Sequence, residues 1–211
     1  MPYNIEIIKK AQYKTSKWSG GTTTELYIYP KGSIYSARDF KWRLSSAVVE
    51  VEHSIFTPLK GISRLIMIIK GELRLCHEGH HKADLKAYEQ DSFNGDWTTT
   101  SFGKVTDFNL MLASGCSGRL EYIFLNKDEF KNIILHNNEK FDEKRLKITE
   151  AFYLVKGDVE IAVGAKRKIK FNQGDLALVT KTDSDKTSEI MISNNSEEES
   201  KIIRATIFYK E

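Results

Sequence analysis

Cysteine is scarce in this chain, which has two in 211 residues, Cys76 and Cys116. Two cysteines are too few for the disulfide framework that holds small secreted domains together. The sequence shows no secretory signal peptide, so we expect free thiols in a cytoplasmic protein. Long apolar runs are missing as well, and no stretch approaches the length of a membrane-spanning helix, which predicts a soluble chain with no membrane partner.

Clusters of basic residues are also missing. The formal net charge is +3, the charges are spread along the chain, and the one dense charged run, residues 197–199, is acidic. A nucleic-acid-binding surface would show clustered Lys and Arg with stacking aromatic residues. We therefore expect no nucleic-acid partner. The length allows one large β domain or two small ones, each with its own core.

Histidine is the third scarce residue, and of the five in the chain only His77, His80 and His81 lie close together. Gly79 stands among them, which predicts an exposed turn at a hairpin tip. Such a turn adsorbs Zn or Ni loosely, whereas a defined metal site needs ligands that project from rigid strands towards one point. We expect no functional metal here, and a chelator should remove any adsorbed metal without unfolding the protein.

Helical patterns are rare, and strand patterns occur along most of the chain. Short segments rich in β-branched and aromatic residues, bounded by Gly, Pro, Asn or Asp, predict strands. The predicted strands are residues 22–29, 41–51, 65–69, 73–76, 108–112, 120–125, 152–155, 159–163, 175–179 and 202–209. Residues 127–135 show roughly helical spacing, and a strand with a loop is an equal alternative. The polar residues 181–200 predict a long exposed loop.

One pattern appears twice and indicates the architecture. Gly71 and Gly157 each join two apolar segments in what reads as a hairpin, and Gly-Asp turns follow at Gly95 and Gly174. Glycine tolerates the positive φ that such turns require. The repeat predicts an all-β fold of two tandem barrels, each enclosing a pocket.

The polar stretch 127–149 separates the two copies of the pattern. The predicted domains are therefore residues 1–126 and 127–211, with strand exchange at the termini as an option. The second domain has few distinctive polar motifs, so a structural or dimer-forming role suits it better than a second site.

The first half carries the residue types suited to a ligand site. Trp18 precedes the double glycine Gly20-Gly21, and Thr22 and Glu25 follow it. A double glycine lets the backbone approach a ligand closely, and its amides can receive an anion. The alternative is a bulge or turn that closes one end of the barrel.

Two later strands place polar side chains on single faces, because strand residues alternate between faces. Arg43 and Ser45 share one face of the first strand, and Asp107 and Asn109 share one face of the second. A guanidinium beside a hydroxyl suits a carboxylate, which it holds in a two-pronged geometry. The alternative is that Arg43 points to solvent.

Charge balance extends this hypothesis. If Arg43, Arg64, Glu25 and Asp107 face one cavity, their charges nearly cancel, which keeps charged groups tolerable in a partly dry site. The alternative is a set of unrelated surface charges at strand ends.

These motifs, taken together, resemble the HutD/Ves family of bicupins. The motifs are Trp18-Ser19-Gly20-Gly21-Thr22 with Glu25, the segment 42–47, Phe56 with the step 61–64, Phe93-Asn94-Gly95-Asp96, and the segment 107–111. They occur in family order over residues 1 to about 125, whereas the second half resembles a generic cupin only in its turns at Gly157 and Gly174-Asp175.

The resemblance implies two cupin barrels in a cytosolic and often dimeric protein. The family is associated with histidine utilisation and with a stress-response protein, and no clear enzymatic activity is implied. What the resemblance suggests is the binding of a small carboxylated metabolite, such as a histidine-degradation intermediate, in the first barrel.

Metal-dependent cupins differ from this sequence at their ligand positions. They carry two histidines and a glutamate just beyond the first hairpin glycine and a third histidine on a later strand. Here Gly71 is followed by residues 72–76 without histidine, none lies near Asp107 or Asn109, and none follows His136. We therefore expect no metal and no other cofactor.

The expected ligand site has assigned roles. Two arginines hold the anion, three side chains donate or accept hydrogen bonds, two carboxylates balance charge, and two aromatic rings close the pocket. The arginines are Arg43 and Arg64, and the hydrogen-bonding residues are Thr22, Ser45 and Asn109. The carboxylates are Glu25 and Asp107, and the aromatic residues are Trp18 and Phe93.

Two alternatives stay open at this point. A metal-independent isomerase or lyase would use Glu25 or Asp107 as general base, provided that burial raises the pKa of that carboxyl group. An interaction protein with side-chain-filled barrels would be favoured if the polar faces turn outward.

Overall fold

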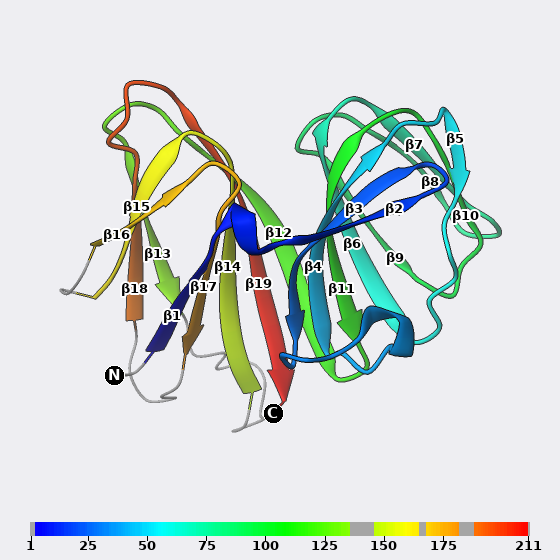
Figure 1. Cartoon of the computed structure of the whole chain (residues 1–211), viewed down its shortest axis with the longest axis horizontal. Helices are drawn as coiled ribbons and strands as arrows, with labels where there is room; N and C mark the ends of the chain where they lie inside the picture. The colour runs from blue at the N-terminus through cyan, green and yellow to red at the C-terminus, as the bar shows by residue number, and fades with distance from the viewer. Residues whose placement is uncertain (1–2, 136–145, 165–167, 182–187, 211) are drawn as a thin grey trace. The chain divides into compact units, whose positions relative to one another are not determined.

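The computed structural model describes residues 3–135, 146–164, 168–181 and 188–210, and the described part is almost entirely β (Figure 1). Two short 3-10 helices, η1 (Lys10–Gln12) and η2 (Tyr35–Ala37), are the only helical turns among these residues. None of the helices described is long and apolar enough to cross a membrane. The all-β expectation is therefore confirmed.

The chain divides into two compact units. Unit 1 comprises residues 1–12 and 121–211, and unit 2 comprises residues 13–120. The division differs from the boundary expected at residues 126 and 127. Residues 1–12 join the C-terminal part because β1 (Tyr3–Ile8) pairs with β17 (Leu176–Lys181), and β12 (Cys116–Leu125) runs through the boundary.

Unit 2 consists of two antiparallel sheets. The six-stranded sheet has the order β2-β3-β4-β11-β6-β9, and the four-stranded sheet has the order β5-β10-β7-β8. Apolar side chains from both sheets, among them Ile66, Leu75 and Phe93, form one core. The strands are β2 (Lys14–Trp18), β3 (Gly21–Tyr29), β4 (Trp42–Val49), β5 (His53–Ile55), β6 (Ile62–Lys70), β7 (Leu73–His77), β8 (Lys82–Leu85), β9 (Gln90–Asn94), β10 (Thr99–Phe102) and β11 (Thr106–Ala113).

Unit 1 also has two sheets. The five-stranded sheet has the order β1-β17-β14-β19-β12, and the four-stranded sheet has the order β13-β18-β15-β16. Their shared core includes Phe152, Ile161 and Ile192, none of which is exposed. The strands not yet introduced are β13 (Phe130–Leu135), β14 (Leu146–Lys156), β15 (Asp158–Val163), β16 (Lys168–Asn172), β18 (Ser188–Ser193) and β19 (Ser200–Lys210).

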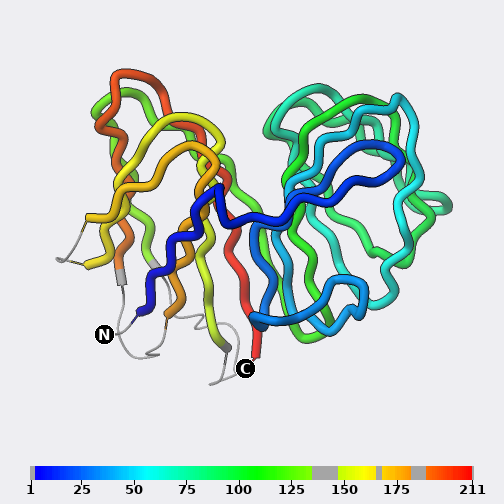
Figure 2. Tube along the Cα trace, viewed as in Figure 1, coloured from blue at the N-terminus to red at the C-terminus, as the bar shows by residue number. Residues whose placement is uncertain are grey.

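The same strand order occurs in both units. The order β9-β6-β11-β4 corresponds to β17-β14-β19-β12, and β5-β10-β7-β8 corresponds to β13-β18-β15-β16. The run from β4 to β11 is therefore repeated by the run from β12 to β19, and each run can be followed along the tube in Figure 2. Closure into barrels, which we expected, is not shown, because the two sheets of each unit form separate ladders among the described residues.

The hairpin interpretation of the repeat is wrong. β6 pairs with β9 and β11, whereas β7 pairs with β8 and β10, so Gly71 carries the chain from one sheet to the other. Gly157 makes the same crossover between β14 and β15, and the two glycines have φ of +90° and +91°. A Cβ on Gly71 would lie 2.4 Å from the carbonyl oxygen of Lys104. Positive φ and close backbone approach both require glycine there.

Two local expectations can now be compared with the structure. For residues 127–135, the strand alternative is confirmed over the helical one, because Phe130–Leu135 form β13. Residues 181–200 are not one long exposed loop, because they contain β18, whose Ile190 and Ile192 are fully buried. Residues 182–187 of that segment lie outside the described part of the chain.

Candidate ligand-binding site

Unit 2 holds a cavity of about 290 Å³ that is lined mainly by its six-stranded sheet. β4 and β11 supply its polar floor, and β2, β5 and the residues after β5 supply its walls. The lining residues are Ser16, Trp18, Thr23, Tyr35, Arg43, Ser45, Ala47, Val49, Ser54, Ile55, Phe56, Thr57, Arg64, Asp107, Asn109 and Met111. Its volume suits a small molecule rather than a macromolecular segment.

Six of the nine residues that the sequence suggested line this cavity: Trp18, Arg43, Ser45, Arg64, Asp107 and Asn109. The alternation along β4 and β11 brings the polar residues of both strands to one face. Because Asn109 pairs with Ser45 and Met111 pairs with Arg43, neighbouring strands place them side by side. The alternative of an interaction protein required these polar faces to turn outward. Because they line a cavity instead, the structure does not favour that alternative.

The other three suggested residues lie beside the cavity. Thr22 is replaced in the lining by its neighbour Thr23, which takes the opposite face of β3. Glu25 reaches the site through its ion pair with Arg43, and Phe93 lies behind Arg64.

In the double glycine, Gly21 has a structural role, because it allows β3 to pack closely against β4. A Cβ on Gly21, which has φ of +149°, would lie 2.0 Å from the carbonyl oxygen of Val48. The close approach of β3 to β4 therefore requires glycine, which favours the structural alternative over a backbone approach to a ligand.

Tyr35 was missed by the sequence reasoning. It lies in η2, outside any strand pattern, and its ring lies under the guanidinium of Arg43 at 4.3 Å. A cation–π contact of this kind depends on chain segments that meet only in the folded protein. No signal in the sequence indicated it.

Arg43 is buried, with 4% of its surface exposed, and its guanidinium is largely occupied by protein groups. Nε donates to Glu25 Oε2 at 2.8 Å, and Nη1 donates to Ser45 Oγ at 3.0 Å. These bonds hold the side chain in one orientation at the floor of the cavity. The sequence suggested Arg43 and Arg64 together as anion ligands, and of the two, Arg43 is the one whose guanidinium is held by protein side chains.

Arg64 is the unsatisfied cation of the site. It has 8% of its surface exposed, and its guanidinium carbon lies 4.7 Å from the centre of the Phe56 ring and 5.1 Å from that of Phe93. Its buried Nε has no hydrogen-bond partner among the described residues. Burial lowers the pKa of Arg64 to about 10, which leaves it charged at neutral pH.

Asn109 and Asp107 complete the polar floor on β11. The buried Oδ1 of Asn109 has no hydrogen-bond partner in the described part of the chain. Burial raises the pKa of Asp107 to about 7, although the Arg64 charge and the N–H of Ala47, which donates to Oδ1 at 3.3 Å, act in the opposite direction. Near neutral pH, this carboxyl group is therefore divided between an acid and a base form.

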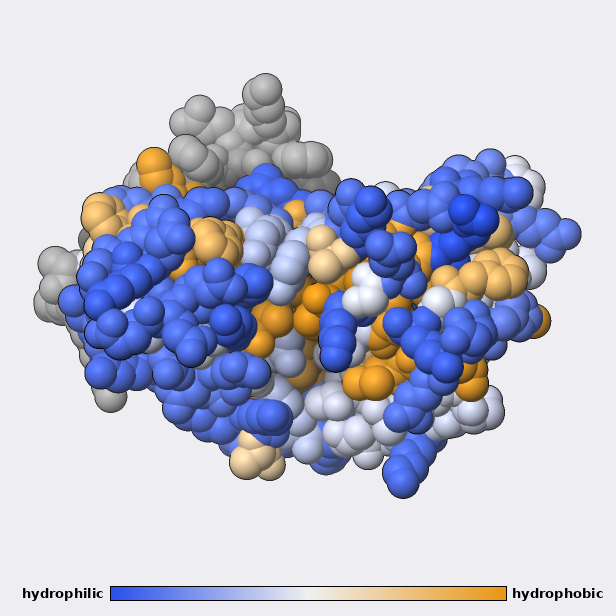
Figure 3. All heavy atoms as spheres, turned by 90° about the horizontal axis from the view of Figure 1, so that it is seen from above, coloured by the Kyte–Doolittle hydropathy of each residue, from blue (hydrophilic) through white to orange (hydrophobic). Residues whose placement is uncertain are grey.

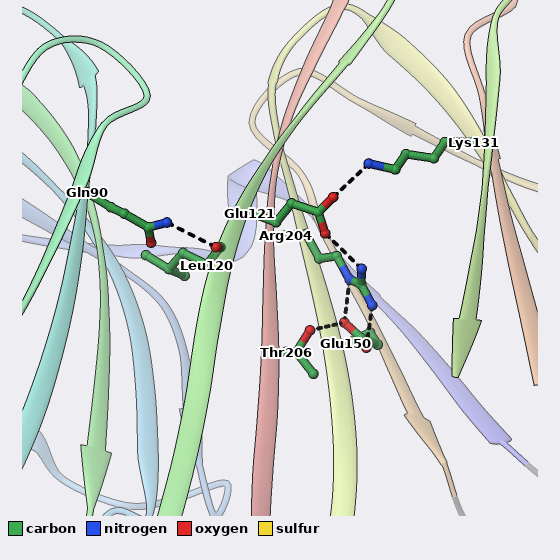
Figure 4. A network of polar contacts seen from close by, with 7 residues as sticks. All are labelled: Gln90, Leu120, Glu121, Lys131, Glu150, Arg204 and Thr206. Carbon is green, nitrogen blue, oxygen red and sulfur yellow. Dashed lines mark hydrogen bonds and ion pairs between the residues drawn. The ribbon is translucent and has the colours of Figure 1, made fainter. Parts of the chain in front are cut away.

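Unit 1 fills the corresponding place with its own side chains (Figure 4). Arg204 Nε and Nη2 each donate to a Glu150 oxygen at 2.8 Å, and Arg204 Nη1 donates to Glu121 Oε2 at 2.9 Å. The Thr206 hydroxyl donates to Glu150 Oε2 at 2.9 Å, and Lys131 pairs with Glu121. Burial raises the pKa of Glu121, but the hydrogen bonds from Lys131 and Arg204 outweigh it and lower the pKa below its ordinary value.

Hydrophilic residues cover most of the face seen in Figure 3, and hydrophobic ones show in the gaps between them. The large hydrophobic residues with the highest exposed fractions are separate in sequence: Ile34, Ile55 and Phe130. Ile55 lines the cavity of unit 2, as do the exposed Trp18 and Tyr35.

Comparisons with known proteins agree with this architecture. The conserved protein PA5104 of unknown function from Pseudomonas aeruginosa PAO1 superposes with a TM-score of 0.78 at 19% identity, over 97% of this chain and 98% of that chain. HutD from Pseudomonas fluorescens SBW25, in a formate condition, superposes with a TM-score of 0.67 at 20% identity, over 99% and 100%.

A variant of oxalate decarboxylase from Bacillus subtilis, a cupin protein, gives a TM-score of 0.67 at 8% identity, over 94% of this chain and 76% of that chain. At these identities the likeness shows the fold alone. Among curated proteins, none matches this chain. A family model described as HutD matches residues 10–197. Because that match spans most of the chain, and because the fold agrees with it, the chain belongs to the HutD family.

Proposed function

We propose that unit 2 binds a small carboxylated metabolite in its cavity without a metal ion. Arg64 carries the proposal, because it is a buried guanidinium whose Nε has no hydrogen-bond partner among the described residues. An unsatisfied buried donor is unfavourable, and more so when it is charged. A ligand carboxylate offers acceptor oxygens in the bidentate geometry that a guanidinium prefers.

The internal repeat supports this assignment. Arg64 and Glu150 lie the same number of residues before their crossover glycines, and they pair with Met111 and Thr206 respectively. Two residues earlier on the partner strands, Asn109 corresponds to Arg204. In unit 1 these positions satisfy each other, whereas in unit 2 both have an unsatisfied buried atom. We infer that the ligand of unit 2 supplies what Glu150 supplies in unit 1.

Size and polarity narrow the ligand class. A cavity of about 290 Å³ lies at the small end of the usual range for ligand pockets. Its walls combine the apolar surfaces of Trp18, Phe56 and Met111 with the polar floor. A metabolite with one carboxylate and a short, partly apolar body fits this lining.

Asp107 adds a pH dependence to the proposal. When protonated, its carboxyl group donates a hydrogen bond, and when ionised it repels an anion. With its pKa raised by burial to about 7, affinity for a carboxylate should fall as the pH rises through neutrality.

The family resemblance directs the choice of ligands to test. Because it implies an association with histidine utilisation, we include imidazole-derived and formylated acids in a panel of small carboxylates. The test is calorimetric titration and thermal shift of the untagged chain with this panel. Each charge-assisted hydrogen bond contributes roughly 1.5 to 3 kcal/mol, so Arg64→Met should reduce affinity by at least about tenfold.

Arg119→Met is the matched control, because Arg119 is an exposed arginine of unit 2 outside the cavity lining. It should leave affinity unchanged. Equal affinity of wild type and Arg64→Met for every acid that binds would contradict the proposal, as would the absence of any response across the panel.

A second candidate is a metal-independent isomerase or lyase that uses Asp107 as general base. The raised pKa of Asp107 favours it, because a base with a pKa near the working pH is the most effective. Glu25 is the weaker choice, since its Oε2 accepts from Arg43 at 2.8 Å and it does not line the cavity. For this candidate, Asp107→Asn should abolish turnover of a bound acid while binding persists, and unchanged turnover would exclude it.

A further inference from the structure

The histidine cluster lies at the tip of the β7–β8 hairpin, in the exposed turn that the sequence predicted, but His77 is buried. The side chain of His77, at the end of β7, has none of its surface exposed. Its Nδ1 is hydrogen-bonded to Thr99 Oγ1 at 2.8 Å, and its Nε2 lies 2.9 Å from Asp91 Oδ2. His80 and His81 have the surface positions expected, and the ring of His80 stacks on Trp97.

Asp91 also contacts a second histidine, His81. His81 Nε2 lies 3.0 Å from Asp91 Oδ1 and 3.1 Å from Oδ2. The three ligand atoms of His77, His81 and Asp91 all lie within 4.8 Å of one another. Zinc bonds to nitrogen and oxygen are about 2.0 to 2.2 Å long, so ligands of a tetrahedral ion are separated by roughly 3.3 Å. The spacing of this cluster therefore approaches that of a metal site.

We propose that His77, His81 and Asp91 bind a divalent metal ion of the zinc class. Two imidazoles and one carboxylate form a donor set typical of zinc sites with three protein ligands. This inference departs from our sequence-based expectation of no metal, because that expectation rested on cupin ligand positions and on an exposed turn. His77 and His81 belong to the cluster considered then, whereas Asp91 comes from β9 and was not part of it.

Two of the three ligands are already held in place. His77 projects from β7 and Asp91 from β9, and Asp91 Oδ1 accepts from the N–H of Ser92 at 2.8 Å. The Thr99 hydroxyl serves as the outer partner of His77, because a hydroxyl donates and accepts and so holds either tautomer. His81 precedes β8 and is 40% exposed, so it is the ligand that can adjust.

The electrostatics agree with metal binding. In the metal-free chain, Nε2–H of His77 donates to the Asp91 carboxylate, and Nδ1 accepts from the Thr99 hydroxyl. A metal ion would take the place of the Nε2 proton, and the Thr99 hydroxyl would then accept from Nδ1–H. The single carboxylate offsets part of the charge of a divalent ion.

The surroundings leave room for a fourth ligand. A cavity of about 480 Å³, lined by Cys76, Thr98 and Thr100 as well as His77, His80 and His81, opens beside the cluster. It shares no lining residue with the cavity of about 290 Å³ in which we propose that a carboxylate binds. Because β7 and β9 belong to different sheets of unit 2, a bound ion would also link the two sheets.

The test measures zinc binding by the untagged full chain after removal of metal with EDTA. Equilibrium dialysis against zinc chloride, followed by elemental analysis, should give one zinc per chain, and zinc should raise the unfolding temperature. His81→Ala should weaken binding by on the order of a hundredfold or more, because even loss of an outer partner weakens binding by about 10 to 100-fold. Asp91→Asn should have a similar effect.

Two histidines serve as controls. His80→Ala removes a neighbour outside the triad, and His53→Ala removes a histidine of β5 that lies against Phe102. Both variants should bind zinc like the wild type. Arg64→Met should also leave zinc binding unchanged, which separates this site from the carboxylate cavity.

The proposal is overturned if the wild-type chain binds no zinc at equimolar concentration. It is also overturned if His81→Ala binds zinc as tightly as the wild type, or if His80→Ala loses as much affinity as His81→Ala. His81 is partly exposed, so its replacement leaves the core intact and keeps the comparison valid.

Discussion

At the scale of single residues, the two arginines of the cavity differ in what satisfies them. Arg43 has Glu25 and Ser45 as partners, whereas Arg64 contacts aromatic rings and has an unsatisfied Nε among the described residues. A residue kept for a ligand is often unfavourable for the empty protein. The two arginines should therefore respond in opposite ways to replacement.

Arg64→Met should stabilise the ligand-free chain. Methionine fills a similar volume and removes a buried, unsatisfied charge, a change of roughly 1 to 3 kcal/mol in favour of the variant. Thermal unfolding without ligand measures it. A variant that unfolds several degrees below the wild type would show that Arg64 is part of the scaffold.

Arg43→Met should instead destabilise the chain, because it leaves the Glu25 carboxylate without its partner. Loss of one member of a buried pair costs about 3 to 5 kcal/mol, but Glu25 is 27% exposed and regains water, so we expect roughly 1 to 3 kcal/mol. Urea unfolding of Arg43→Met and of the double variant with Glu25→Gln checks the cause. The double variant should recover part of the loss, and no recovery would argue against the ion pair as the reason.

Asp107→Asn should change how stability depends on pH. A group whose pKa is raised on folding, here from the ordinary 3.8 to about 7, contributes stability that is present below its unfolded pKa and is lost as the pH rises through its folded pKa. Asparagine is always neutral and keeps the carbonyl oxygen that accepts from Ala47. At pH 5 the two proteins should therefore differ less than at pH 8, where the variant should be the more stable.

Each pKa unit corresponds to about 1.4 kcal/mol, and about two units of the shift lie between pH 5 and the folded pKa. The difference between the two proteins should therefore change by about 2 to 3 kcal/mol across this window. Denaturant unfolding at both pH values measures it. A constant difference between the two proteins from pH 5 to pH 8 would show that Asp107 has an ordinary pKa.

At the scale of the elements, the crossover glycines decide how the strands are distributed between sheets. Gly71 and Gly115 both have positive φ, but an added Cβ meets the Lys104 carbonyl oxygen at 2.4 Å in the first case and nothing within 4 Å in the second. The pair therefore separates backbone strain from steric clash.

Gly115→Ala should lower the free energy of unfolding by about 1 to 2 kcal/mol, from the left-handed backbone alone. Gly71→Ala should lower it by about 2 to 5 kcal/mol, because the clash also forces the backbone of Lys104 and Val105, just before β11, away from the crossover. Urea midpoints of the two variants give the comparison. Equal losses would mean that the close approach at Gly71 is relieved at little cost.

At the scale of the whole molecule, the internal repeat places Arg64 and Asn109 of unit 2 where unit 1 has Glu150 and Arg204. Of these four described residues, the two in unit 2 have a buried polar atom without a hydrogen-bond partner. We expect one carboxylate per chain in calorimetric titration. Hydrogen exchange should slow on β6 and β11 when the ligand binds, with no matching change on β14 and β19. Replacement of the exposed Lys131, which pairs with Glu121 in unit 1, should leave ligand affinity unchanged.

A stoichiometry of two, or protection spread equally over β14 and β19, would contradict a single site in unit 2. The same titration bears on the repeat, because a second ligand in unit 1 would have to displace Glu150 from Arg204. Such displacement would leave both charges unpaired in a buried place.

Much of the candidate site was predictable, because side-chain alternation is a local property of a strand. Arg43 with Ser45, and Asp107 with Asn109, share faces in any β-strand, whatever lies beside it. The repeat of Gly71 at Gly157 was also predictable, because a turn with positive φ favours glycine whatever the rest of the fold is. The all-β class followed from residue types that prefer strands.

What only the tertiary structure decided is which groups find partners. Three features depend on strands far apart in the chain: the pairing of Arg43 with Glu25, the lack of a hydrogen-bond partner for Arg64 Nε among the described residues, and the placement of β6 and β7 in different sheets. His77 and Asp91 meet although β7 and β9 belong to different sheets, and the spacing of the two residues in the sequence does not indicate this contact. A sequence specifies the face on which a charged group lies, whereas long-range packing determines whether that group is satisfied, and an unsatisfied buried group is what indicates a ligand.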